Sequence, residues 1–220
     1  SFTVTVPTTQ DTLLEPTETV PLTIGGVTGQ GSIIDDDAPL VLDLDGNDSS
    51  GRIGSGYVTT FTEGGGAVAI GDVDVRITDI DSSAVAGATV TLTNAQAGDL
   101  LAAGGMPAGI SASVAGNVVT LTGAGTLATY EAAIRAVSFA NGSTNPDTTP
   151  RNIEVTLTDG VSNSNTAVTT INVVSVNSAP VVAPETGTTP EDTPISGNVL
   201  TNDSDPDGDM DTTDEYVVPQ

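Results

Sequence analysis

The densest group of potential metal ligands in the sequence lies between residues 203 and 209. Asp203, Asp205, Asp207 and Asp209 alternate with Ser, Pro and Gly, which matches the D-x-D-x-D-G opening of a calcium-binding loop. Calcium takes about six to eight oxygen ligands, and closely spaced aspartates in a flexible turn can supply several of them. The sequence therefore predicts a calcium site here, and the alternative is a solvated acidic linker. Because residues 195–200 are predicted to form a strand, we do not expect the flanking helices of an EF-hand.

A second acidic group marks an earlier junction in the chain. Asp35, Asp36 and Asp37 follow a strand-like run and precede an Ala-Pro pair. Calcium bound here would stabilise the ordered joint, whereas three adjacent carboxylates without metal repel one another. The alternative is a charged, flexible linker. Further carboxylates are expected to converge on this junction from one pole of the middle segment and from the preceding segment: Glu15, Glu18, Glu63, Asp79 and Asp81.

Two weaker candidates, Asp159 and Asn177, follow the last two predicted strands of the middle segment. One carboxylate and one amide supply too few oxygens for a calcium ion. We therefore expect them to bind calcium only together with Glu191 and the loop at 203–209.

Two further clusters of aspartate can be explained without a bound metal ion. Asp43 and Asp45 open the run Asp-Leu-Asp-Gly-Asn-Asp, which can bind calcium or can form a surface turn in which Asn47 and Asp48 cap their own backbone. The two readings are left open. Asp72 and Asp74 flank Val73, so they would share one face of a strand, and there we favour a polar face exposed to solvent.

Composition excludes most catalytic chemistries. The chain has 29 Asp and Glu against 4 Lys and Arg, contains no His and no Cys, and carries a formal net charge of −25. These absences exclude a Ser/His/Asp triad, a thiol nucleophile, a zinc finger and a disulfide framework. The acidity disfavours nucleic acid as a partner, since phosphate binding needs clustered Lys and Arg. A carboxylate hydrolase is also disfavoured, because only 3% of residues are aromatic and few rings can stack on a sugar, so we expect no enzyme.

The pattern of apolar residues predicts an all-β fold with one short helix. Leu127, Tyr130, Ile134 and Val137 recur at helical spacing, and Thr126 is placed to cap that helix. No run approaches the roughly 18 apolar residues of a membrane span, so no membrane insertion is expected. The predicted strands of the middle segment are 39–43, 57–62, 67–70, 73–78, 88–93, 110–114, 117–122, 136–140, 152–158 and 166–176.

Two similar punctuations divide the chain into three segments. A strand-like run, an acidic or amide cluster and Ala-Pro occur near residue 38 and again near residue 179, where proline blocks further strand pairing. The segments are 1–38, with predicted strands at 2–6 and 19–24, 39–180, and 181–220. Only 39–180 has enough strands for a complete domain. Its long connection at 94–110 is a decorative loop or, alternatively, a recognition surface for a sugar or peptide.

Three stretches resemble modules of large bacterial surface proteins. Residues 11–37, with Glu15, Glu18 and the triple aspartate, resemble the end of a Calx-β domain. The middle segment carries the motifs 60–70 (TFTEGGGAVAI), 77–82 (ITDIDS), 127–139 and 157–160 (LTDG). With these motifs it is similar to bacterial cadherin-like repeats of RTX-type adhesins. The third stretch, from 189 to 209, resembles the start of another tandem repeat of such adhesins.

The resemblance implies a fold and a setting for the chain. The fold is a Greek-key β-sandwich of the cadherin/immunoglobulin type, flanked by partial β-sandwich modules. The setting is a secreted adhesin on the bacterial cell surface, loaded with Ca²⁺ and supporting adhesion and biofilm formation. The implied partners are neighbouring domains of the same long chain and a glycan or protein on a target surface. The chain departs from animal cadherins at Asn177, which lacks the adjoining acidic pair of their linkers.

Overall fold

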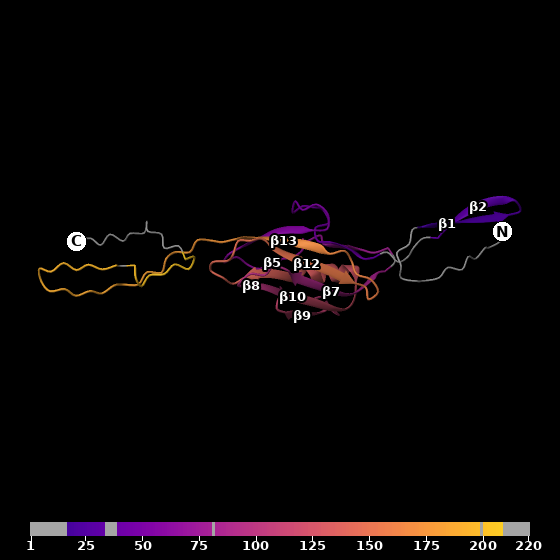
Figure 1. The fold of residues 1–220 in the computed structure, drawn as a ribbon. Coiled ribbons are helices and arrows are strands. Elements are labelled where there is room, and N and C mark those ends of the chain that lie inside the picture. Colours follow the sequence, from indigo (N-terminus) through magenta and orange to yellow (C-terminus); the bar gives the residue numbers. More distant parts are fainter. Residues whose placement is uncertain (1–16, 34–38, 81, 199, 209–220) are drawn as a thin grey trace.

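A computed structural model describes residues 17–33, 39–80, 82–198 and 200–208. In these ranges the chain is built of β-strands with one short helix, so the all-β prediction is confirmed (Figure 1). The strand predicted at 2–6 lies outside the described residues. So do six of the candidate ligands: Glu15, Asp35, Asp36, Asp37, Asp81 and Asp209.

One layer of the central domain is a six-stranded sheet. Its central strands β12 and β13 alternate: every second side chain is buried. Neighbouring strands are antiparallel except for β4 and β13, which are parallel. In spatial order the strands are β4 (Tyr57–Thr62), β13 (Ala167–Val174), β12 (Arg151–Thr158), β7 (Ala84–Leu92), β10 (Val118–Thr126) and β9 (Ser111–Ala115).

The opposing layer consists of two smaller sheets and the helix. A three-stranded sheet joins β5 (Val68–Ala69), β11 (Val137–Asn141) and β8 (Asp99–Ala103), and a two-stranded sheet joins β3 (Val41–Asp43) and β6 (Arg76–Thr78). Phe61 of β4 meets Phe139 of β11 edge to face, with ring centroids 5.6 Å apart. This contact lies in the core between the layers, and the arrangement is an Ig-like β-sandwich.

The helix forms where the spacing of apolar residues predicts it. It is α1 (Leu127–Arg135), and the side chain of Thr126 accepts a hydrogen bond from the Thr129 backbone N–H at 3.2 Å, which confirms the predicted cap. Tyr130, Ala133 and Ile134 are buried. The Tyr130 hydroxyl donates to the Gly123 carbonyl at 2.6 Å, so this ring is satisfied within the core.

The structure departs from the predicted elements in three places. The connection at 94–110 is not a plain loop, because β8 lies within it and pairs with β11. The strand predicted at 73–78 begins only at Arg76, since the preceding residues turn back and the Val75 N–H donates to the Asp72 carbonyl. The prediction of a strand at 195–200 is wrong for the described residues of that range, since 195–198 and 200 are not in a strand.

The chain enters and leaves the central domain at opposite ends. At the entering end, Leu42 of β3 exchanges two backbone hydrogen bonds with the side chain of Asn165, which lies just before β13 begins. β13 then runs to Val174 at the other end of the sheet, and the chain leaves from there. Before the domain lies a hairpin of β1 (Glu18–Ile24) and β2 (Val27–Ile33). After it, the described residues 178–198 and 200–208 form no strand, and an isolated β-bridge joins Val181 to Ser204.

Candidate cation-binding sites

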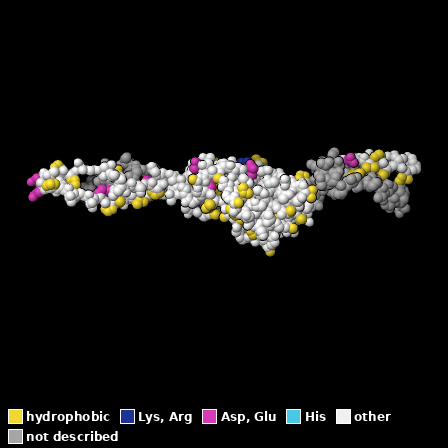
Figure 2. All heavy atoms as spheres, turned by 60° about the horizontal axis from the view of Figure 1, so that its bottom comes forward, with side chains coloured by type: hydrophobic (Ala, Val, Ile, Leu, Met, Phe, Trp, Pro, Cys, Tyr) yellow, Lys and Arg dark blue, Asp and Glu magenta, His cyan; other side chains and the backbone are white. Residues whose placement is uncertain are grey.

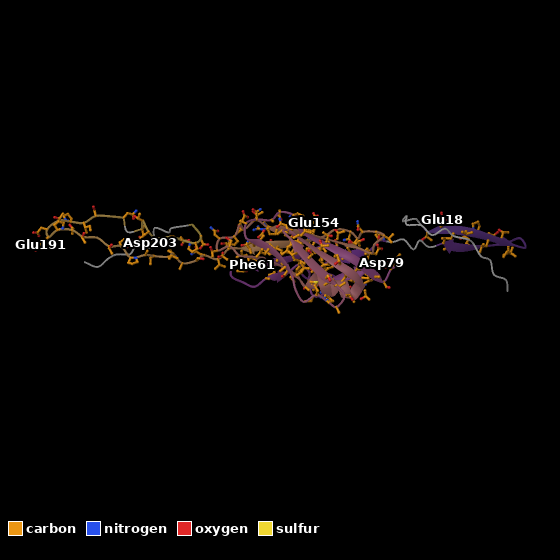
Figure 3. All side chains as sticks on the ribbon, turned by 90° about the horizontal axis from the view of Figure 1, so that it is seen from below. Glu18, Phe61, Asp79, Glu154, Glu191 and Asp203 are labelled. Carbon is orange, nitrogen blue, oxygen red and sulfur yellow. The ribbon has the colours of Figure 1, made fainter. Side chains whose placement is uncertain are left out.

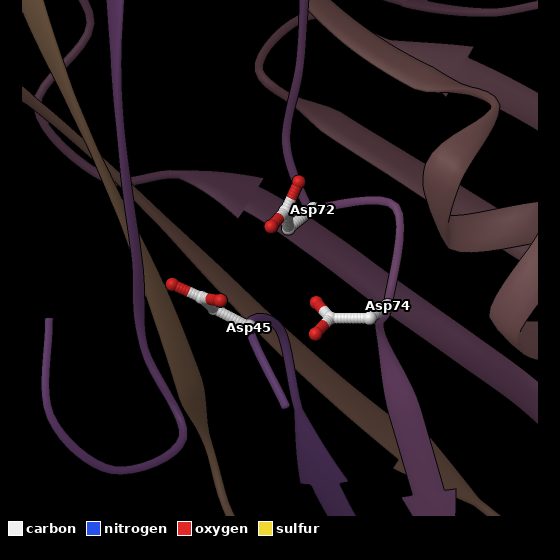
Figure 4. A group of neighbouring side chains, drawn as sticks. All are labelled: Asp45, Asp72 and Asp74. Atoms are coloured by element: carbon white, nitrogen blue, oxygen red, sulfur yellow. The ribbon is translucent and has the colours of Figure 1, made fainter. Parts of the chain in front are cut away.

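Three aspartates from two separate loops converge on the flank of the central domain (Figure 4). Asp45 follows β3, and Asp72 and Asp74 lie in the turn that precedes β6. Because β3 and β6 pair with Asp43 opposite Arg76, the loops at their adjoining ends are held side by side. The Asp72 N–H donates to the Leu44 carbonyl at 2.8 Å and fixes this arrangement.

The three carboxylates are close together; Asp45 is buried, and Asp72 and Asp74 are partly exposed. One oxygen of each lies within 4.8 Å of the others, and Asp45 has 0% of its surface exposed. Gly46 permits this proximity, because a Cβ atom at that position would lie 3.0 Å from the Asp74 carbonyl oxygen. The cluster is therefore built into the backbone packing of two loops.

The carboxylate of Asp45 is held by donors from its own loop. It accepts hydrogen bonds from the backbone N–H groups of Ser49, at 3.0 Å, and Ser50, at 2.8 Å. Burial raises the pKa of Asp45, but the hydrogen bonds from Ser50 and Ser49 outweigh it, and the net pKa lies below the ordinary value. Asp45 is thus an ionised carboxylate in a buried position.

The other two carboxylates have fewer donors. Asp72 accepts from its neighbour Val73, at 2.7 Å, and from the Ser49 hydroxyl, at 2.9 Å. The Oδ1 atom of Asp74 is buried and has no hydrogen-bond partner. The sequence pointed to a solvent face for Asp72 and Asp74 because they alternate around Val73, whereas the structure turns them towards Asp45.

The run from Asp43 to Asp48 also forms the surface turn that the sequence offered as the alternative to calcium binding. Asn47 accepts from the Ser49 N–H at 2.8 Å, and Asp48 accepts from the Gly54 N–H at 3.1 Å. The Asp43 carboxylate accepts from the Asp45 N–H at 3.1 Å. The turn reading therefore holds for Asn47 and Asp48, while Asp45 faces the other two aspartates.

The carboxylates predicted to meet at the first junction do not share one pole. Glu63 follows β4 and accepts from the Val176 N–H, at 2.9 Å, so it lies at the end where the chain leaves the domain. Asp79 follows β6 at the opposite end and accepts from the Ser82 N–H at 3.0 Å. Glu18 is exposed in β1, opposite Ile33. The expected convergence of Glu63 with Asp79 is therefore wrong, because parallel β4 and β13 carry Glu63 to the far pole.

The sheet also separates Asp159 from Asn177, which were predicted to bind calcium together with Glu191 and the loop at 203–209. Asp159 follows β12 and Asn177 follows β13, and these antiparallel strands end at opposite poles. Asp159 caps its own turn, accepting from the N–H groups of Val161 and Ser162 at 2.7 Å each. Burial opposes ionisation of Asp159, but these hydrogen bonds lower its pKa below the ordinary value. Glu191 lies far from Asp203 along the C-terminal segment, so it does not join the acidic loop (Figure 3).

Within the C-terminal loop, the aspartates bond to nearby backbone. Asp203 accepts from the Ala183 N–H at 2.8 Å, and Asp205 accepts from the Asp207 N–H at 2.7 Å. Asp207 accepts from the Ser178 N–H at 2.5 Å, and its carbonyl accepts from the Asn145 side chain at 2.6 Å. These two bonds join the loop to the chain-leaving pole of the central domain. Among the described residues, the loop brings no three carboxylates within 4.8 Å of one another.

A buried ion pair was not foreseen from the sequence. The Arg151 side chain donates to Asp99 at 2.6 Å, and both side chains have 0% exposure. The second Asp99 oxygen accepts from Asn141 at 2.7 Å, and Arg151 also donates to the carbonyls of Thr149 and Asp147. The available signal was that Arg151 is one of only four cationic side chains in the sequence.

Acidic side chains are sparse over the body of the central domain on the face seen in Figure 2, where uncharged side chains predominate. None of the helices in the described ranges is long and apolar enough to cross a membrane.

Comparison with known proteins gives one match. Residues 177–219 match the bacterial Ig domain family, so the third segment resembles a bacterial Ig-like repeat. No curated protein matches the chain, and no solved structure does. The match supports the expectation of a bacterial tandem-repeat protein, and the RTX and Calx-β resemblances remain predictions.

Proposed function

We propose that the chain is a structural module of a bacterial surface adhesin, one of a linear series of β-sandwich repeats whose joints are stiffened by Ca²⁺. The observation that carries the proposal is the path of the chain, which enters the central domain beside Asn165 and leaves it after Val174, at the opposite end of the sheet. Such a domain adds its length to an array, because its neighbours attach at opposite poles. The bacterial Ig match at 177–219 supports a second repeat beginning directly after the first.

Direct contacts at the leaving pole support a defined joint. Ser178 and Asn145 both bond to Asp207, and Glu63 accepts from Ser175 and Val176 in the connecting segment. Asp203, Asp205 and Asp207 therefore lie within the segment that meets the pole. Calcium bound by this loop would bring the acidic segment and the pole together and restrict bending between them.

Small-angle scattering of the full chain tests the stiffening. We expect a longer, narrower distribution of distances in calcium than in chelator, because bound metal favours the ordered joint. A variant with Asp203, Asp205 and Asp207 all changed to Asn should give the chelator profile in both conditions, whereas Glu154→Gln, a change on an exposed face of β12, should behave as the parent. Identical parent profiles in calcium and chelator would contradict the stiffening.

The rival function, recognition of a sugar or peptide by residues 94–110, has less support. β8 occupies the centre of this stretch and pairs along its length with β11, and Leu101 is buried in the core. The segment is therefore largely committed to the sandwich.

A further inference from the structure

We propose that Asp45, Asp72 and Asp74 bind one divalent cation, Ca²⁺, at a site internal to the central domain. None of these ligands lies at a joint, so the site does not depend on the proposal that calcium stiffens the array. It would fasten the loop after β3 to the turn before β6 (Figure 4).

The separation of the carboxylates suits a common ion. Two oxygens bound to one calcium at about 2.4 Å can be at most about 4.8 Å apart, on opposite sides of the ion. One oxygen from each aspartate lies within that limit of the other two. These separations suit one shared ion, which small side-chain rotations could bring into contact with all three carboxylates.

An unsatisfied buried atom points to a missing ligand. The Oδ1 atom of Asp74 is buried and accepts no hydrogen bond, and Figure 4 shows its carboxylate directed towards Asp45 and Asp72. Buried carboxylate oxygens in folded proteins nearly always have a partner, since leaving one without a donor is costly. A cation between the three carboxylates would supply that partner.

The cluster also lacks a protein cation. Asp45 is fully buried and lies beside two more carboxylates, yet within the described ranges Arg151 alone forms ion pairs, and it pairs elsewhere. Arg76, the nearest arginine along the chain, has an exposed side chain. Close carboxylates repel unless a positive charge lies between them.

The remaining oxygens favour a hard cation. The Ser49 hydroxyl lies 2.9 Å from Asp72 and 3.3 Å from Asp45, and its one proton can serve only one of them at a time. Its oxygen is a further potential ligand beside the three carboxylates. The chain has no His or Cys, so an all-oxygen site suits Ca²⁺ better than a transition metal.

Calorimetric titration of the full chain with CaCl₂ tests the site directly. We expect Asp74→Asn and Asp72→Asn each to bind one ion fewer per chain than the parent, and Glu154→Gln to bind the parental number. Asparagine keeps the side-chain shape, so the fold should persist. An unchanged stoichiometry in both asparagine variants, or no calcium binding by the parent, would overturn the proposal.

Thermal melting adds a second test, because the direction of the change in melting temperature distinguishes an ion ligand from a purely structural residue. In chelator, Asp74→Asn should melt at or above the parental temperature, because it removes a repelling charge. At a calcium concentration roughly a hundred times Kd, the parent should gain about 5–10 °C from this site and Asp74→Asn should not. If Asp74→Asn lowers the melting temperature equally in chelator and in calcium, the residue has a purely structural role and the site is rejected.

Hydrogen exchange separates this site from the joints. In the variant with Asp203, Asp205 and Asp207 changed to Asn, calcium should still slow exchange in residues 44–56 and 70–76. Loss of that protection in the joint variant would reject an independent internal site. If that protection persists while the scattering profile of the parent is the same in calcium and in chelator, only the proposal of a stiffened joint is rejected.

Discussion

Two buried carboxylates in the central domain differ in how the protein compensates their charge. Asp99 pairs with Arg151 at 2.6 Å, and its second oxygen accepts from Asn141. Asp45 is equally hidden from water, but it accepts from backbone N–H groups and the Ser49 hydroxyl, and it lies beside two more aspartates. One site is complete within the protein, while the other gathers negative charge around a buried oxygen that has no partner.

The difference shows how a chain with 29 acidic residues and 4 arginines distributes its charge. A buried arginine neutralises one position whatever the solution contains. The carboxylate cluster, which has no arginine, would by our proposal be neutralised by a cation from the medium. The contribution of the Asp99–Arg151 pair to stability should therefore be independent of calcium concentration. The contribution of the cluster at Asp45 should increase with calcium concentration.

The largest expected effect is at the ion pair. Asp99→Ala leaves the Arg151 guanidinium buried without its carboxylate, which should cost about 3–5 kcal/mol of the free energy of unfolding. Chemical denaturation in chelator and in calcium measures this loss, which should be the same in both. A loss that calcium partly restores would place Asp99 in the calcium-dependent group and end the contrast.

A smaller loss is expected at Asp45. Asp45→Ala removes the acceptor for the Ser49 and Ser50 N–H groups, which should cost about 1–3 kcal/mol in chelator. In calcium the difference from the parent should widen, because the variant also lacks an ion ligand. Denaturation curves of both proteins in both conditions test this, and a difference that is the same in chelator and calcium would contradict it.

The sequence predicted those parts of the molecule that depend on local pattern. β12 alternates strictly, and α1 has apolar residues at helical spacing behind a threonine cap, so both were foreseen. The flank cluster was not, because Asp72 and Asp74 around Val73 look like strand alternation. The turn at 71–75 depends on tertiary packing, since the Asp72 N–H donates to the carbonyl of Leu44 in another loop. It also needs glycine at position 71, because a Cβ there would lie 2.6 Å from the Val75 Cγ2 atom.

The poles were misassigned for a related reason. Which acids share an end of the sandwich depends on strand direction, and the parallel pairing of β4 with β13 is not visible in local sequence. Conversely, the acidic loop at 203–207, the densest in the sequence, places its described carboxylates on nearby backbone donors. For the described residues of this loop, density of aspartate along the chain therefore did not indicate convergence in space.

Acid should lower the stability of the domain by protonating carboxylates that accept hydrogen bonds in the folded state. The pKa of Asp159 is lowered from 3.8 by donors in its own turn, so its contribution to stability is present above that value and is lost as the pH falls through the lower folded value. Melting temperature measured from pH 6 to pH 2 should fall less steeply for Asp159→Asn than for the parent. Parallel profiles would show that this turn carries no such linkage.

The smallest effects are expected where carboxylates face solvent. Glu154→Gln, on the exposed face of β12, should change the free energy of unfolding by less than about 0.5 kcal/mol in chelator and in calcium. The same denaturation series measures it. A calcium-dependent change here would mean that calcium acts through general charge screening, which would remove the distinction between Asp45 and Asp99.

The parallel pairing of β4 and β13 has a mechanical consequence for a chain held at both ends. Tension applied through the linkers pulls β13 towards one pole by its last residue, while the preceding chain draws β4 towards the other. The load then acts along the strands, and the ladder from Tyr57 beside Thr169 to Thr62 beside Val174 is sheared as a unit, without peeling one bond at a time. A domain loaded in this direction resists extension until the whole ladder gives way.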